Sequence, residues 1–170
     1  MSGEYPILPN GKLGRPVDWV EPHEPQLPSA ATNMDAFGAR YFAEYYLNLL
    51  AYSINTGNTT TLKKVSSPDC KVCQTIIDKI DRQYAADGGN VGMEYEVKSL
   101  DDAIPHTSIE NVYLVVSTVR TPDYIRYDKE GQIISDMERN EVIQLEADGR
   151  SGSFVTPHLY GEPEEKGSQS

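Results

Sequence analysis

The amino-acid sequence predicts an α+β domain in which N-terminal helices pack on one face of an antiparallel sheet. Two changes of pattern along the chain support this fold class. Apolar residues recur at helical spacing in three segments before residue 87, and the hydrophobic period changes to two after Gly92. Turn-forming residues then join the later apolar segments to their neighbours, which favours an antiparallel meander over a parallel sheet.

The first and longest predicted helix follows residues 32–35, whose sequence Thr-Asn-Met-Asp resembles a capping box. Gly57 is well placed to end this helix. Aromatic and aliphatic residues recur every three or four positions between these points: Phe37, Tyr41, Tyr45, Leu49 and Tyr52, with Phe42, Tyr46, Leu50 and Ile54 beside them. Such wide apolar coverage predicts burial on more than one side. An interior filled by Phe37, Tyr41, Ile76 and Ile80 would exclude an enzyme pocket.

Two shorter helices are expected next, the first over residues 59–65. Ser67 and Pro68 have the residue types of an N-cap and a first helical position, so they predict the start of the second, which runs to about Tyr84. Its apolar stripe consists of Cys70, Cys73, Ile76, Ile77, Ile80 and Tyr84. Residues 87–90, Asp-Gly-Gly-Asn, are expected to end it.

The remaining segments have the patterns of strands. Apolar and charged residues alternate over 93–97, and residues 112–119 are rich in β-branched side chains. A turn at 128–131 separates predicted strands at 124–127 and 132–135. A further strand is expected over 142–147, followed by a hairpin that opens at Asp148 and Gly149 and leads into residues 153–160.

The two ends of the chain differ from the middle. Residues 1–33 hold six of the eleven prolines, so they predict an extended arm or linker without regular secondary structure. The only tryptophan, Trp19, lies in this arm, which is interpreted either as a flexible spacer or as a segment whose tryptophan docks on the domain. Residues 161–170 are expected to form a disordered acidic tail. A single domain over 34–160 remains.

Charge and hydropathy exclude several classes of function. The 170 residues carry a formal net charge of −11, which disfavours binding to nucleic acid or to an anionic membrane surface. No apolar stretch approaches the roughly 18 residues of a membrane-spanning helix. Residues 1–3 also lack the basic and apolar regions of a signal peptide, so the protein is either cytoplasmic or exported by a signal outside these residues.

The chain resembles a family of actinobacterial lipoproteins of unknown function, the domain of unknown function 6318, over residues 34–160. The resemblance rests on Ala-Phe-Gly at 36–38, Asn-Thr-Gly-Asn at 55–58, Ser-Pro-Asp-Cys-Lys-Val-Cys at 67–73 and Gly-Gly at 88–89. It implies a nuclear-transport-factor-2-like cone, in which a curved antiparallel sheet cups a long helix. It also implies export and a lipid anchor upstream of these residues. The resemblance also leads us to expect a tryptophan on the last strand, where this chain has Phe154.

Cys70 and Cys73 form the strongest local signal for chemistry. Residues three apart on a helix have Cα atoms about 5 Å from each other, which allows a disulfide. A structural disulfide in an oxidising compartment is the favoured interpretation. A thioredoxin-like redox pair is an alternative, because a helix start lowers a thiol pKa, although that motif normally follows a strand. The third interpretation is that both cysteines are reduced residues of the core.

Catalytic and metal-binding motifs are otherwise missing from the sequence. Two cysteines and three scattered histidines do not supply the four ligands of a zinc site, and no cofactor fingerprint is present, so no metal and no cofactor are expected. A cone of the implied kind can hold a pocket that combines a tyrosine with a carboxylate. Its candidate members are Tyr41, Tyr45, Asp78, Tyr95 and Tyr113.

These observations favour a non-catalytic domain on the extracellular face of the cell membrane, held there by a lipid anchor outside these residues. Its expected partner is a small ligand or another protein, and a homodimer is an alternative that the sequence leaves open. Two other functions stay open: a small enzyme with a tyrosine and aspartate pocket, and a thiol-disulfide protein that uses Cys70 and Cys73.

Overall fold

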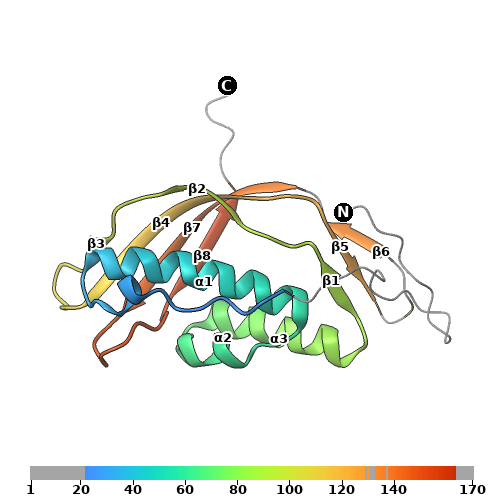
Figure 1. The fold of residues 1–170 in the computed structure, drawn as a ribbon, viewed down its shortest axis with the longest axis horizontal. Helices are drawn as coiled ribbons and strands as arrows, with labels where there is room; N and C mark the ends of the chain where they lie inside the picture. The colour runs from blue at the N-terminus through green and yellow to red at the C-terminus, as the bar shows by residue number, and fades with distance from the viewer. Residues whose placement is uncertain (1–21, 129, 131–132, 137, 164–170) are drawn as a thin grey trace, which may run out of the picture.

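A computed structural model describes residues 22–128, 130, 133–136 and 138–163 of the chain. Three α-helices lie on one side of a bent, mostly antiparallel sheet, which confirms the α+β fold (Figure 1). The described part of the arm, from residue 22, runs beside α1 to a short 3-10 helix, η1 (Ser29–Thr32). Trp19 and the rest of the predicted arm lie outside the described residues.

The long helix α1 (Ala36–Thr56) begins and ends at residues with clear local causes. Its N-cap is Asp35, whose carboxylate accepts the Gly38 N–H at 2.7 Å. The predicted capping box at Thr32 is therefore wrong, because the Thr32 hydroxyl donates to the Ser29 carbonyl inside η1 instead. The predicted end at Gly57 is confirmed, since this residue adopts a φ of 77°, which favours glycine.

The other helices are α2 (Thr60–Val65) and α3 (Lys71–Ala85). The predicted start of α3 at Ser67 and Pro68 is wrong, because residues 67–70 form a turn in which the Cys70 N–H donates to the Ser67 carbonyl at 3.0 Å. The Ser67 N–H donates to the carbonyl of Thr156 at 2.9 Å, so this backbone is tied to the segment before the last strand. The helix begins only after Cys70, which is its N-cap.

Within the described ranges, eight strands form two sections of sheet: β1 (Gly89–Val91), β2 (Glu96–Leu100), β3 (Ile104–Pro105), β4 (Val112–Thr121), β5 (Tyr124–Tyr127), β6 (Ile133–Asp136), β7 (Arg139–Asp148) and β8 (Leu159–Pro163). One section has the order β2-β4-β7-β8 with β3 also beside β4, and the other has the order β1-β5-β6. Every pairing between these strands is antiparallel.

The two sections are joined by a bend that two paired strands share. In register, Thr121 faces Arg139 at the end of one section and Tyr124 faces Asp136 at the start of the other. The passage from β4 to β5 therefore lies opposite the passage from β6 to β7, and both occur at the bend. The resulting sheet curves over α1, and its β1-β5-β6 section extends past the end of that helix (Figure 1).

Several strands differ from the sequence prediction: β1 and β3 were not predicted, and β7 begins at Arg139, three residues before the predicted start at 142. The first half-buried strand was expected over 93–97, but β2 begins at Glu96, because the backbone of Met93 is bonded to the side chain of Asn55 instead of a neighbouring strand. The last strand begins at Leu159 and continues to Pro163. It thus takes in residues 161–163 of the predicted tail, and the remainder of that tail lies outside the described residues.

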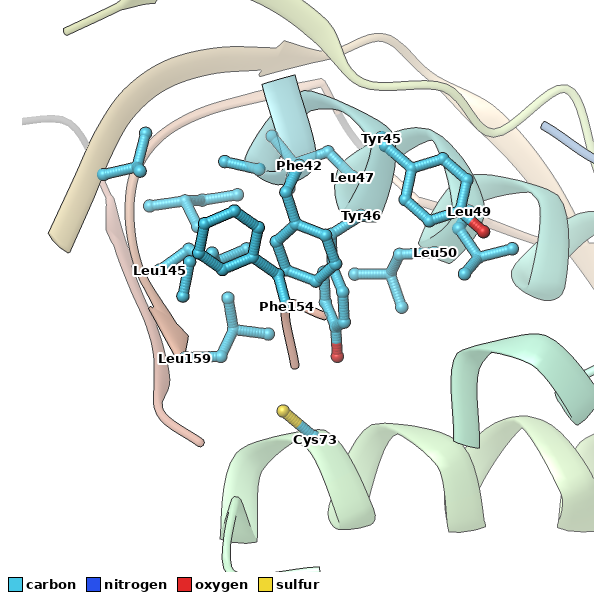
Figure 2. Close-up of a cluster of buried hydrophobic side chains, with 14 of the residues drawn as sticks. Phe42, Tyr45, Tyr46, Leu47, Leu49, Leu50, Cys73, Leu145, Phe154 and Leu159 are labelled. Atoms are coloured by element: carbon cyan, nitrogen blue, oxygen red, sulfur yellow. The ribbon is translucent and has the colours of Figure 1, made fainter. Parts of the chain in front are cut away.

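The core lies between α1 and the concave face of the sheet. Phe42 and Tyr46 are 1% exposed, and the rings of Phe42 and Phe154 lie 5.6 Å apart, with Leu145 and Leu159 beside them (Figure 2). No helix among the described residues is long and apolar enough to cross a membrane.

Phe37 and Tyr41 do not fill the interior of the domain. Phe37 is 71% exposed and Tyr41 is 45% exposed. Both lie on the same stripe of α1 as Glu44 and Asn48, which are also exposed. The polar residues identify this stripe as the solvent face, whereas Phe42, Tyr46 and Leu49 follow the face that meets the sheet.

Candidate functional site

A hollow of about 430 Å³ lies beside the bend of the sheet, between α3 and the strands beyond the end of α1. Its apolar lining comes from the helices: Ile54 near the end of α1, and Ile76 and Ile80 on α3. Polar and charged side chains from α3 and the sheet line the rest. The hollow exists because α1 stops at Gly57 while the sheet continues into β1, β5 and β6.

Two charged residues reach the hollow from the start of β7. Antiparallel register pairs Arg139 with Thr121 and Glu141 with Val119, and both partners are buried on the concave face. Side chains alternate along a strand, so Arg139 and Glu141 share this face with the buried residues Ile143 and Leu145 farther along β7. The Arg139 Nε atom lies 2.8 Å from the Glu141 Oε1 atom.

Tyr95 lines the same hollow, and a side chain far away in sequence fixes the backbone just before it. The amide of Asn55 donates to the Met93 carbonyl at 2.7 Å and accepts the Met93 N–H at 3.0 Å. Because both groups of Met93 are fixed, the backbone two residues before Tyr95 is fixed to α1. No hydrogen-bond partner of the Tyr95 hydroxyl occurs in the described ranges. Burial raises the pKa of Tyr95 above its ordinary value, and the nearby Glu141 raises it further.

A second hollow of about 340 Å³ continues along α3 and shares Lys79, Gln83 and Arg126 with the first. Its other lining residues are Ala86, Gly88, Tyr127, Asp128 and Glu130. The Gly-Gly pair makes this approach of β5 to the end of α3 feasible, because a Cβ atom at Gly89 would lie 2.5 Å from the Tyr127 hydroxyl. We call the first the inner hollow and the second the outer hollow.

The predicted pocket residues are not gathered at one place. Tyr41 and Tyr113 line two separate hollows elsewhere, Tyr45 is buried against Phe42, and Asp78 is exposed on α3. Of the five, Tyr95 is the one that lines the inner hollow. The tyrosine and aspartate of the predicted pocket are thus separated by the fold.

Sequence reasoning missed Lys79, Arg139 and Glu141. A signal for the last two was present in the alternation of the strand over 139–148. Its alternate positions 143, 145 and 147 are apolar, whereas 139 and 141 on the same face are charged. A helix covers the apolar part of that face, so the charged part marks where the cover ends.

Cys70 and Cys73 lie at disulfide-bonding distance, with Cα atoms 5.2 Å apart. The Cys73 N–H donates to the Cys70 Sγ atom at 3.2 Å, so the first cysteine also caps α3. Both residues are 1% exposed, and Cys73 faces the core below Phe154 and Leu159 (Figure 2). This burial leaves no surface on which a second protein's thiol could reach the sulfur atoms, and it favours a structural role.

Comparison with known proteins gives one family and one distant structural neighbour. A family described as "Family of unknown function (DUF6318)" matches residues 22–152. No curated protein matches the chain. A crystal structure of the intermembrane space region of the chloroplast protein ARC6 is similar in fold, with a TM-score of 0.60 at 12% sequence identity, covering 78% of this chain and 99% of that one.

Proposed function

The chain belongs to the DUF6318 family of unknown function, and we propose that it is a cell-envelope domain that binds a small ligand without transforming it. The observation that carries this proposal is the inner hollow. Its volume of about 430 Å³ falls in the range of small-molecule sites, and it combines an aliphatic wall with a few convergent polar groups.

The chemistry of the lining supports binding over catalysis. The guanidinium of Arg139, the ammonium of Lys79 and the hydroxyl of Tyr95 can donate hydrogen bonds to a ligand. Among the described residues that line the inner hollow, there is no serine, cysteine or histidine that a neighbouring base could activate. The carboxylate of Glu141 is engaged by Arg139.

Three observations support the envelope location and a lipid anchor outside these residues. Buried cysteines at bonding distance are typical of proteins from oxidising compartments. The structural neighbour is a region that lies between two membranes. The proline-rich residues 1–33 have the composition of a spacer. A long helix cupped by a bent sheet also supports the nuclear-transport-factor-2-like cone.

Ligand retention tests the binding function. The wild-type protein and two variants are purified from the native host. Small molecules extracted from the three proteins are then compared by mass spectrometry. Ile76→Trp fills the inner hollow, whereas Val72→Trp places the same bulk one turn earlier on the exposed face of α3. We expect a molecule that is retained by the wild type and by Val72→Trp and lost from Ile76→Trp. Equal extracts from all three proteins would refute the proposal.

The location has its own test, which is fractionation of the native host. We expect the full-length protein in the membrane fraction, released by detergent and digested by protease added to intact cells. Recovery in the cytosol, protected from the protease, would contradict the envelope assignment.

Self-association is a second candidate function, favoured by the exposed Phe37 and Tyr41. These rings line a hollow with Val97 and Leu100 of β2, a strand at the edge of its sheet section. Edge strands readily pair with another chain, so we propose a second copy of this chain as the occupant. Sedimentation equilibrium is expected to show a dimer that the double variant Phe37→Ser, Tyr41→Ser converts to a monomer. A wild-type protein that stays monomeric at high concentration would exclude this self-association.

A further inference from the structure

We infer, on the basis of the proposed binding function, that the ligand is an amphiphilic monoanion with a carboxylate head group and an unbranched apolar chain. The inner hollow holds the head group and the outer hollow receives the chain. The charges, the polar donors and the continuity of the two hollows along α3 each contribute to this assignment.

The inner hollow concentrates positive charge in a strongly acidic protein. Two cations, Lys79 and Arg139, line it together with one carboxylate, Glu141, which leaves a formal excess of one positive charge without counting Arg126, whose guanidinium has interactions of its own. The whole chain carries −11, so this excess is local. An anion is therefore attracted to the hollow more than to the surrounding surface.

A hydroxyl donor faces the same space. Tyr95 lines the inner hollow, and no partner for its hydroxyl occurs within the described part of the chain. A carboxylate oxygen between this hydroxyl and the cationic groups would accept charge-assisted hydrogen bonds. Because burial raises the pKa of Tyr95, its hydroxyl keeps the proton that it would donate.

Apolar side chains in both hollows can border the chain of the ligand, and the two hollows meet at Lys79, Gln83 and Arg126. Ile76 and Ile80 form the wall of the inner hollow on α3. Ala86 and the ring of Tyr127 then line the outer hollow of about 340 Å³, which shares residues with the inner one. A flexible chain of methylene groups can lie against these side chains, and each buried methylene contributes about 0.8 kcal/mol.

A single negative charge fits better than two. Glu141 already lies 2.8 Å from Arg139, and Asp128 and Glu130 line the outer hollow. These three carboxylates would repel the second charge of a phosphate monoester. We therefore expect a carboxylate to bind more tightly than a phosphate of equal chain length.

The test is calorimetric titration of the whole chain, stripped of retained molecules, at pH 7.5 and below micellar concentrations, with decanoate, decanol and decyl phosphate. We expect decanoate to bind about tenfold more tightly than decanol, and more tightly than decyl phosphate. Lys79→Gln should weaken decanoate about threefold and leave decanol unchanged. The matched control Lys71→Gln removes the same charge from the first turn of α3, away from the hollow, and should change neither.

Tyr95→Phe separates a binding role from a structural one. It should weaken decanoate binding about fivefold, through the lost donor, while the urea midpoint of the free protein stays unchanged. Equal affinity for decanoate and decanol would overturn the assignment of an anion but leave the binding function standing. Tighter binding of decyl phosphate would overturn the assignment of a monoanion. Absence of binding by all three, with a molecule still retained in the native extract, would overturn the ligand class alone.

Discussion

Replacing Asn55 by alanine tests how the hollow is built. This side chain bonds both the carbonyl and the N–H of Met93, at 2.7 and 3.0 Å, and both residues are buried. Alanine would leave two backbone groups without these partners in a site that water reaches poorly. Each unsatisfied buried group costs about 1–3 kcal/mol, so we expect the free energy of unfolding to fall by about 2–5 kcal/mol.

Urea denaturation monitored by circular dichroism measures this loss, with Asn48→Ala as the control. Asn48 is exposed on the same helix, so its replacement should change stability by less than about 0.5 kcal/mol. The Asn55 variant should also bind decanoate more weakly, because Met93 positions the backbone that leads to Tyr95. Equal stability of the two variants would refute the role assigned to this amide.

Three further predictions concern the core, the alkaline limit and the cysteines. Phe42→Ala should lower the free energy of unfolding by about 3–5 kcal/mol and Phe37→Ala by less than about 0.5 kcal/mol, and equal losses in urea melts would contradict the exposed stripe of α1. Burial raises the pKa of Tyr46 from 10.0 to about 12, although its hydrogen bond to Ser66 lowers it, so the folded state keeps this proton longer than the unfolded chain. The contribution of Tyr46 to stability should therefore be full below pH 10 and fall by about 2–3 kcal/mol as the pH rises to 12. Urea melts of Tyr46→Phe should lose less stability over this range by that amount, and an unchanged loss would contradict the assignment. Iodoacetamide with a reductant should modify Cys70 and Cys73 only in urea, as judged by mass, and rapid labelling of the folded protein would show that the sulfur atoms are accessible.

The sequence was sufficient to predict the helices and strands wherever local causes decide them. Gly57 ends α1 through its own backbone conformation, and the β-branched residues over 112–119 lie within β4. Local patterns failed where a distant contact decides. The Ser67 hydroxyl accepts the Asp69 N–H at 3.1 Å, as a cap would, but in a turn that precedes the helix. The Ser67 N–H is bonded to the carbonyl of Thr156, which is far away in sequence, so residues 67–70 alone could not predict this arrangement.

The candidate site was harder to predict than the fold. The five predicted pocket residues were chosen by residue type, and only the bend of the sheet decides which of them meet. Tyr95 reaches the inner hollow because Asn55 holds the segment before it. Lys79 resembles any exposed lysine of an amphipathic helix until the position of β5 is known. The sequence shows that positions 139 and 141 are charged, whereas 143, 145 and 147 on the same face of the strand are apolar. These charged residues line a hollow only because α1 ends before it covers them.

The central claim is that the uncovered end of the concave face, and no other surface, takes the ligand. Backbone amide chemical shifts of the labelled protein titrated with decanoate test it most directly. We predict that the largest changes map to Tyr95, Lys79 and Arg139. Changes centred on Phe37 and Tyr41, with these three unmoved, would contradict the account.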